Sequence, residues 1–239
     1  MNYAIILSGG VGTRLGLDIP KQYFEVNQKP IIRYVIEAFE KSDVVDGVVI
    51  VAAPEWQGYV REQISDVEKF LGFALPGENR QLSIYSGLCY LKEHLMVRPS
   101  ATELNLDDVV VLIQDAARPN TSSQTIEECF SLEDGVDGAM PVLPMKDTVY
   151  SSVDGTSISG LLDRKTIFTG QAPESFRLGK YMAANEALLP EKILRVNSST
   201  EPAIMAGMNI KMISGDENNY KITTETDLKR FSSMFCDEV

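Results

Sequence analysis

Histidine is almost absent from this chain of 239 residues, which also has only three cysteines and one tryptophan. The one histidine, His94, lies in the helical pattern "LCYLKEHLM" beside core-like leucines, which argues against a zinc centre of histidines and cysteines and against a Ser-His-Asp triad. The cysteines, Cys89, Cys129 and Cys236, form no C-x-x-C pair. An odd, sparse set is typical of a reducing compartment, so we expect three partly buried thiols and a cytoplasmic protein.

Positive charge and long apolar runs are scarce as well. The chain carries 22 Lys and Arg against 34 Asp and Glu, a formal net charge of −12. Non-specific nucleic-acid binding needs a basic face, so no nucleic-acid partner is expected, and any anionic ligand must be met by a local cluster of cations. No apolar stretch approaches the roughly 18 to 20 residues that span a bilayer, and "YAIIL" near the start is too short and lacks the basic flank of a signal peptide. We expect no membrane partner.

Apolar runs that alternate with helical patterns indicate an α/β fold. The runs are continuous, as in strands buried on both faces of a parallel sheet, and helical patterns lie between most of them, so we expect a sandwich built on a mostly parallel, twisted sheet. With 44% hydrophobic residues and no linker-like tract, one domain over 1–239 is the simplest organisation. The expected strands are 2–8, 47–53, 108–114, 138–143 and 208–214. The expected helices are 29–42, 55–71, 79–95, 122–133 and 224–235.

One stretch, 145–170, departs from this alternation. It has no helical period, and residues alternate around "VDGTS", where Asp-Gly is a hairpin signal. Its apolar residues would be exposed on a linker, so we interpret the stretch as a β-arm that projects from the sandwich. An exposed apolar arm usually marks a partner surface.

The loop "LSGGVGTRLGLDIPKQY" (7–23) is the most distinctive segment. It has no Walker A spacing, and Leu15 stands where G-x-G-x-x-G needs its third glycine. Glycines after a strand let backbone N–H groups approach a polyphosphate, while Arg14 can bind phosphate with a planar fork and Lys21 as a point charge. On composition alone, a tight turn with two solvated cations is an equally good interpretation.

Six blocks in register along nearly the whole chain resemble the cytidylyltransferases that act on polyol phosphates, namely 2-C-methyl-D-erythritol 4-phosphate and ribitol-5-phosphate cytidylyltransferases. Six ordered blocks are far more specific than one glycine loop. The blocks are "SGGVGTRLG…PKQY", "GENRQLSIYSGL" (77–88), "VLIQDAARP" (111–119), "MKDTVY" (145–150), "LDRKTIFTGQAPESF" (162–176) and "NNYKITTETDL" (218–228).

The resemblance implies a three-layer, Rossmann-like nucleotidyltransferase sandwich that transfers a cytidylyl group from CTP to a polyol phosphate and releases pyrophosphate. It places Arg14, Lys21 and Lys221 around the α-phosphate, where cations offset the developing charge. Asp115 would hold Mg²⁺ on the nucleotide phosphates, a task suited to a hard oxygen ligand. No general base is needed, because a phosphate monoester is already ionised at neutral pH. The implied nucleotide-binding residues are Gly9, Gly10, Gly12, Thr13, Gly77, Arg80, Ser83, Asp115 and Ala116.

The acceptor side is implied to be shared between two subunits. In this family Thr and Arg side chains of the arm reach into the neighbouring site and grip the polyol phosphate, and the matching positions are Thr148 and Arg164. Arg118 is the third implied acceptor-binding residue. A homodimer formed through the β-arm is therefore expected.

Departures from the family pattern leave the acceptor open, and with it the choice between isoprenoid and surface-polymer synthesis. Ser199 and Thr200 stand in "VNSSTEPAIMAG" where carboxylates are expected, and "QAPESF" replaces the usual "QTPQ" and Phe. Ordinary structural roles also remain open: a cap or an Arg118 salt bridge for Asp115, and a solvated side chain for Lys221. Two other functions are a sugar-1-phosphate nucleotidyltransferase that uses another nucleoside triphosphate and a nucleotide-binding protein without catalysis.

Overall fold

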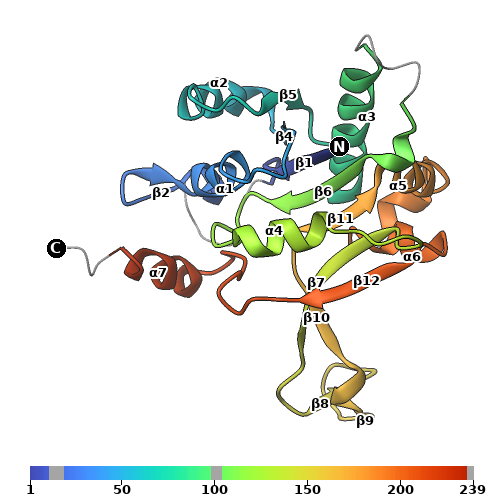
Figure 1. Ribbon diagram of the computed structural model, residues 1–239. Coiled ribbons are helices and arrows are strands. Elements are labelled where there is room, and N and C mark those ends of the chain that lie inside the picture. Colours follow the sequence, from blue (N-terminus) through green and yellow to red (C-terminus); the bar gives the residue numbers. More distant parts are fainter. Residues whose placement is uncertain (11–18, 98–103, 236–239) are drawn as a thin grey trace.

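The computed structural model describes residues 1–10, 19–97 and 104–235. Its centre is an eight-stranded sheet in the order β10-β7-β11-β6-β1-β4-β5, with β12 also beside β7 (Figure 1). Strands β6, β1, β4 and β5 are parallel, whereas β11 runs antiparallel to both β6 and β7. The strands are β1 (Asn2–Leu7), β4 (Gly47–Val51), β5 (Phe70–Ala74), β6 (Val110–Asp115), β7 (Gly138–Pro144), β10 (Phe168–Gly170), β11 (Glu174–Arg177) and β12 (Ile210–Ser214).

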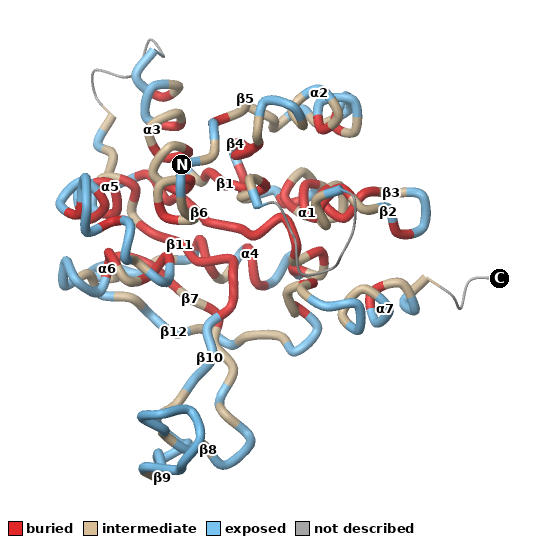
Figure 2. The backbone as a smooth tube through the Cα atoms, turned by 180° about the vertical axis from the view of Figure 1, so that it is seen from behind, coloured by how far each residue is buried: buried red, intermediate tan, exposed pale blue. Residues whose placement is uncertain are grey.

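Helices cover both faces of the sheet, which makes three layers. Strand β1 alternates its side chains between two buried clusters: Ala4 and Ile6 face α1, α2 and α4, while Tyr3 and Ile5 face α3, α5 and α6. Figure 2 shows the buried strands between these two layers. The expected α/β sandwich with a mostly parallel sheet is confirmed. The helices are α1 (Ile31–Glu40), α2 (Pro54–Gln63), α3 (Arg80–Met96), α4 (Ser123–Phe130), α5 (Leu178–Glu186), α6 (Glu201–Met205) and α7 (Glu225–Ser233).

The helix expected over 55–71 was wrong in its second half. Helix α2 ends at Gln63, and residues 70–74 form strand β5. The side chain of Arg33 on α1 accounts for this end: its Nη1 donates to the Gln63 carbonyl at 3.0 Å, and it forms an ion pair with Asp66 at 2.7 Å. A contact from another helix therefore stops α2, and no pattern within 55–71 shows it. Strands β10 and β11 and helices α5 and α6 were not predicted.

The arm is a hairpin of β8 (Val149–Ser151) and β9 (Gly160–Leu162) that projects below the sheet (Figure 1). The Asp-Gly pair lies in the connecting loop 152–159: Asp154 accepts hydrogen bonds from the backbone N–H of Thr156 and of Ser157, both at 2.8 Å, and Gly155 has a φ of +73°. The chain rejoins the main sheet at β10, so the projecting part ends before Phe168, slightly earlier than the expected 170.

The arm exposes large apolar side chains. Val153 is 95% exposed, Ile158 70% and Leu161 69%. Within the described ranges, no helix has the length and apolar character that crossing a membrane requires.

Candidate active site

A pocket of about 520 Å³ opens at the carboxyl ends of β1 and β6. Chain order reverses here, since β4 and β5 follow β1 on one side and β6 lies on the other. Open α/β sheets bind ligands at this kind of position. The register pairs Leu7 with Asp115, and the Ala116 N–H donates to the Leu7 carbonyl at 3.0 Å, which fixes the two strand ends together. The lining residues are Leu7, Gly9, Gly10, Lys21, Gln22, Gly77, Glu78, Asn79, Arg80, Ser83, Asp115, Ala116, Ala117, Lys221 and Thr223.

The start of the glycine loop is held by a buried glutamine. Gln22 is 3% exposed, and its Nε2 donates to the carbonyls of Ser8 and Gly10, both at 2.8 Å. Gly9 passes so close to Pro76 that a Cβ would lie 2.5 Å from the proline Cβ, so this position requires glycine. Gln22 was not among the predicted site residues, although it stands inside the "PKQY" block.

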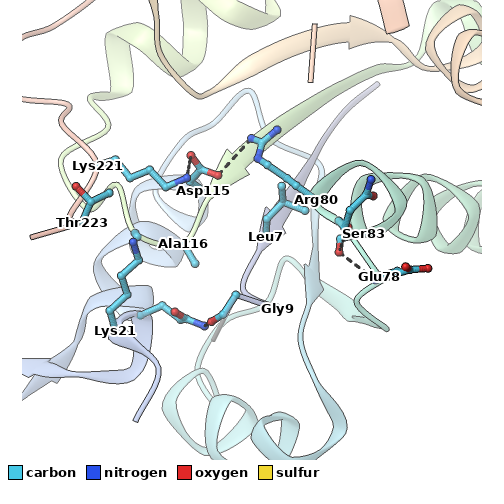
Figure 3. Close-up of a pocket in the computed structure, with 15 residues that line it drawn as sticks. Leu7, Gly9, Lys21, Glu78, Arg80, Ser83, Asp115, Ala116, Lys221 and Thr223 are labelled. Carbon is cyan, nitrogen blue, oxygen red and sulfur yellow. Dashed lines mark hydrogen bonds and ion pairs between the residues drawn. The ribbon is translucent and has the colours of Figure 1, made fainter. Parts of the chain in front are cut away.

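Lys21 begins a short 3₁₀ helix (Lys21–Tyr23) that the same contacts anchor. The Tyr23 side chain is buried, and its hydroxyl accepts a hydrogen bond from the Ser8 hydroxyl at 2.9 Å. Its ring stacks on the Trp56 ring, with 4.5 Å between the ring centroids. With the two following residues fixed in the core, the backbone of Lys21 is placed at the pocket rim. Figure 3 shows its side chain extending toward Ala116.

Asp115 is the buried acidic centre of the pocket. Its carboxylate forms ion pairs with Lys221 Nζ at 3.0 Å and Arg80 Nη2 at 3.2 Å (Figure 3). A third ion pair joins it to Arg118 Nε at 3.5 Å. Burial alone would raise the pKa of Asp115, but the charges of Arg80, Lys221 and Arg118 outweigh it and hold that pKa far below its usual range. Three cations around one carboxylate leave excess positive charge, which suits an anionic ligand.

The wall of the pocket is formed by the start of α3. Asn79 caps the helix, accepting from the Leu82 N–H at 2.8 Å, and the Ser83 hydroxyl accepts from the Gly77 N–H at 3.0 Å. A Cβ on Gly77 would lie 2.4 Å from the Leu82 Cβ, so the turn requires glycine. Ser83 therefore also fixes the turn, a structural role beside the predicted one in nucleotide binding.

Glu174, at the start of β11, is a buried carboxylate that sequence analysis did not identify as a site residue. It is 7% exposed, and its Oε2 lies 4.0 Å from Arg80 Nη2 without a hydrogen-bond partner in the described part of the chain. Burial raises the pKa of Glu174 to about 7, although Arg80 opposes the shift. Its signal in the sequence was the departure "QAPESF" from the usual "QTPQ".

Replacing this carboxyl, Glu174→Gln, is expected to stabilise the fold at alkaline pH. Because the pKa of Glu174 is raised from 4.5 to about 7 in the folded state, this group contributes most to the free energy of unfolding below pH 4.5. The contribution is lost as the pH rises through 7. We expect the variant to gain about 3 kcal/mol, or ~6–12 °C in Tm, at pH 8 and much less at pH 5. Thermal unfolding at both pH values measures this. The control is Glu62→Gln on the exposed face of α2; an equal gain at both pH values for Glu174→Gln would contradict the assignment.

The structure brings most of the predicted nucleotide-binding residues into this one pocket. Gly12, Thr13 and Arg14 lie outside the described residues. Arg118 does not line the pocket but lies behind Asp115, so the salt bridge considered for this pair is present. The predicted pocket residues found together are Gly9, Gly10, Lys21, Gly77, Arg80, Ser83, Asp115, Ala116 and Lys221.

The two arm residues lie elsewhere. Thr148 and Arg164 are exposed, and neither belongs to the pocket of its own chain. The Arg164 Nη1 donates to the Lys146 carbonyl at 2.8 Å, and Lys146 pairs with Glu217. Ser199 and Thr200, at the positions where carboxylates were expected, are buried beside α5, where the Tyr181 hydroxyl donates to the Ser199 carbonyl at 2.6 Å.

The order of the strands, and the pocket at the point where that order reverses (the switch point of the sheet), define an α/β nucleotidyltransferase fold, shared with solved structures. A crystal structure of 4-diphosphocytidyl-2C-methyl-D-erythritol synthase from Anaerococcus prevotii has a TM-score of 0.79 at 19% identity, covering 98% of this chain and 97% of that one. That of 2-C-methyl-D-erythritol 4-phosphate cytidylyltransferase from Francisella tularensis has a TM-score of 0.75 at 25% identity, with 97% and 98% covered.

The family model for 2-C-methyl-D-erythritol 4-phosphate cytidylyltransferase matches residues 2–235, and the chain belongs to this family. A ribitol-5-phosphate cytidylyltransferase from Streptococcus agalactiae serotype III is 30% identical over 98% of this chain and 95% of that protein. A 2-C-methyl-D-erythritol 4-phosphate cytidylyltransferase from Rubrobacter xylanophilus is 32% identical over 94% and 90%. The family resemblance inferred from the six blocks is confirmed.

Proposed function

We propose that this protein transfers the cytidylyl group of CTP to a polyol phosphate and releases pyrophosphate. The observation that supports this most strongly is the pocket itself. Lys21 at its rim and the Arg80 and Lys221 side chains around Asp115 supply positive charge at the switch point of the sheet. Family membership and relatives named as cytidylyltransferases supply the substrate class.

In this proposal Lys21 and Lys221 flank the α-phosphate of CTP, together with Arg14 of the glycine loop. The acceptor phosphate attacks the α-phosphorus, the bond to the β-phosphate oxygen breaks, and pyrophosphate leaves. Charge grows on the α-phosphate oxygens in this step, and fixed cations stabilise it without reorganisation. An ionised phosphate monoester attacks without a general base, which suits a chain with a single histidine.

Mg²⁺ is the proposed cofactor, held by Asp115 and the phosphates of CTP. No group of three or more His, Cys, Asp or Glu within the described ranges forms a metal site by itself. One buried carboxylate fits Mg²⁺, which commonly takes one or two carboxylates and fills its other positions with substrate phosphates and water. When bound, the ion would neutralise the charge of the leaving pyrophosphate.

The turn at Gly77 and Ser83 is the proposed cytosine and ribose site. Both residues line the pocket, and their backbone packing against Leu82 leaves little freedom in the wall. A rigid pocket of cytosine size excludes purines by shape. A preference for CTP over UTP and GTP separates this proposal from a sugar-1-phosphate nucleotidyltransferase.

A homodimer completes the proposed acceptor site. Thr148 and Arg164 are exposed on an arm that projects from its own subunit and carries the apolar residues Ile158 and Leu161. Burial of this apolar surface against a second copy would stabilise a dimer and carry the two polar residues to the neighbouring pocket. A cytoplasmic location, where CTP is made, is part of the proposal.

The acceptor is tested by pyrophosphate release from CTP and Mg²⁺ with 2-C-methyl-D-erythritol 4-phosphate, D-ribitol 5-phosphate and related pentitol phosphates. We expect one of them to be preferred by at least about 10-fold in kcat/KM, because a site that hydrogen-bonds acceptor hydroxyls rejects analogues that leave its polar groups unpaired. The matched controls replace CTP by UTP or GTP. Absence of turnover with every acceptor would contradict the proposal and favour a protein that only binds nucleotide.

A further inference from the structure

Two residues before Lys221 the chain completes a turn (216–219), closed by a hydrogen bond from the Asn219 N–H to the Asp216 carbonyl at 3.0 Å. Asn219 in this turn is 1% exposed. Its Nδ2 donates to the Ala172 carbonyl at 2.8 Å, and its Oδ1 accepts from the Thr121 hydroxyl at 3.3 Å. Its carbonyl accepts from Arg118 Nη1 at 2.6 Å. One asparagine thus joins the segment before Lys221 to two parts of the chain that are distant in sequence, the segment 118–121 and Ala172.

The Gln171 side chain, where the chain returns from the arm, forms hydrogen bonds with the backbone of the same turn. It follows β10 directly and is 6% exposed. Its Oε1 accepts from the Asp216 N–H at 3.0 Å, while its Nε2 donates to the carbonyls of Asp216 at 2.9 Å and Asn219 at 3.3 Å. A buried amide that uses both its donor and its acceptor on one backbone turn restricts that turn strongly.

The chain is also fixed just after the lysine. Ile222 is fully buried, and its N–H donates to the Ala117 carbonyl at 2.8 Å. Ala117 itself lies two residues after Asp115. The backbone on both sides of Lys221 is therefore attached to the segment that carries the carboxylate which its Nζ contacts at 3.0 Å.

We infer that Asn219 and Gln171 are positioning residues that hold Lys221 in place for the transfer step. The inference rests on the proposed function, in which Lys221 stabilises charge on the α-phosphate. A lysine side chain is long and flexible, so its value as a fixed cation depends on a fixed backbone. Neither amide lines the pocket, so each acts through Lys221 and not on CTP itself.

The test is the replacement Asn219→Ala in wild-type protein and in a Lys221→Ala background. With wild-type Lys221, we expect kcat to fall about 10- to 100-fold, the range that a displaced catalytic group produces, while KM for CTP changes less than about threefold. The matched control is Asn218→Ala, an exposed neighbour, for which kcat should stay within about twofold.

The double-mutant cycle separates positioning from a general loss of structure. If Asn219 acts through Lys221, Asn219→Ala costs less than about twofold in kcat once Lys221 is alanine. An equal loss in both backgrounds, or a loss confined to KM, would overturn the inference. Where thermal unfolding shows that Asn219→Ala does not fold, Gln171→Met replaces it in the same cycle. Absence of turnover in the wild type would instead contradict the proposed function, and the inference with it.

Discussion

Replacing Lys221 by alanine is expected to lower kcat about 10²- to 10³-fold without unfolding the protein. Removing one preorganised donor to a developing anion typically costs this much. Folding should persist, because Asp115 keeps Arg80 at 3.2 Å and Arg118 at 3.5 Å after the lysine is gone. Steady-state kinetics of pyrophosphate release and a thermal unfolding curve measure the two effects.

The matched control for this variant is Lys229→Ala. Lys229 is an exposed lysine of α7 that pairs with Glu225 on the same helix, so its loss removes the same charge away from the pocket. We expect its kcat to stay within about twofold of wild type. A Lys221→Ala enzyme that keeps more than about a tenth of wild-type kcat would show that Lys221 only neutralises Asp115.

Two inactive variants, Arg164→Ala and Lys221→Ala, are expected to restore activity to each other when they are mixed as subunits. In the proposed dimer, each site combines the pocket of one chain with the arm of its partner. A mixed dimer therefore holds one site with both Lys221 and Arg164 intact and one site with neither. Random pairing of equal amounts should give about a quarter of wild-type activity.

Co-expression with two different affinity tags isolates the mixed dimer for this assay. The control combines Arg164→Ala and Lys221→Ala in one chain and pairs it with wild type, which leaves each site of the mixed dimer with one defect. If the isolated mixed dimer of single variants is no more active than its parents, the arm does not act across subunits. Sedimentation of the fully active protein as a monomer would contradict the shared site as well.

Five strands of the main sheet and five helices could be predicted because the signals are local. Strands such as "NYAIIL" and "DVVVLIQ" are buried on both faces of the sheet. Such burial requires apolar residues at nearly every position, and a continuous apolar run is visible in the sequence. The end of α2 could not be predicted, since Arg33 from another helix determines it. Strand β11 is short and begins with the charged Glu174, so its burial between β6 and β7 follows from tertiary packing alone.

The residues of the candidate site also fall into those that could be predicted from the sequence and those that could not. Cations and glycines near the strand ends were predicted because their residue types and ordered blocks carry the chemistry. Gln22, Gln171 and Asn219 were missed because buried amides in a sequence look like ordinary loop residues. Their partners are distant in the chain: the contact between Thr121 and Asn219 spans 98 residues. Only the folded structure shows that these amides surround the segments bearing Lys21 and Lys221.

In the proposed reaction, an attacking polyol phosphate breaks the bond between the α- and β-phosphates of CTP. The most direct measurement follows CTP labelled with ³²P either at the α- or at the γ-phosphate, with Mg²⁺ and the preferred acceptor. We expect the α label to appear in a CDP-linked polyol and the γ label in pyrophosphate. Transfer of the γ label to the acceptor, or release of labelled phosphate without a CDP-linked product, would contradict it.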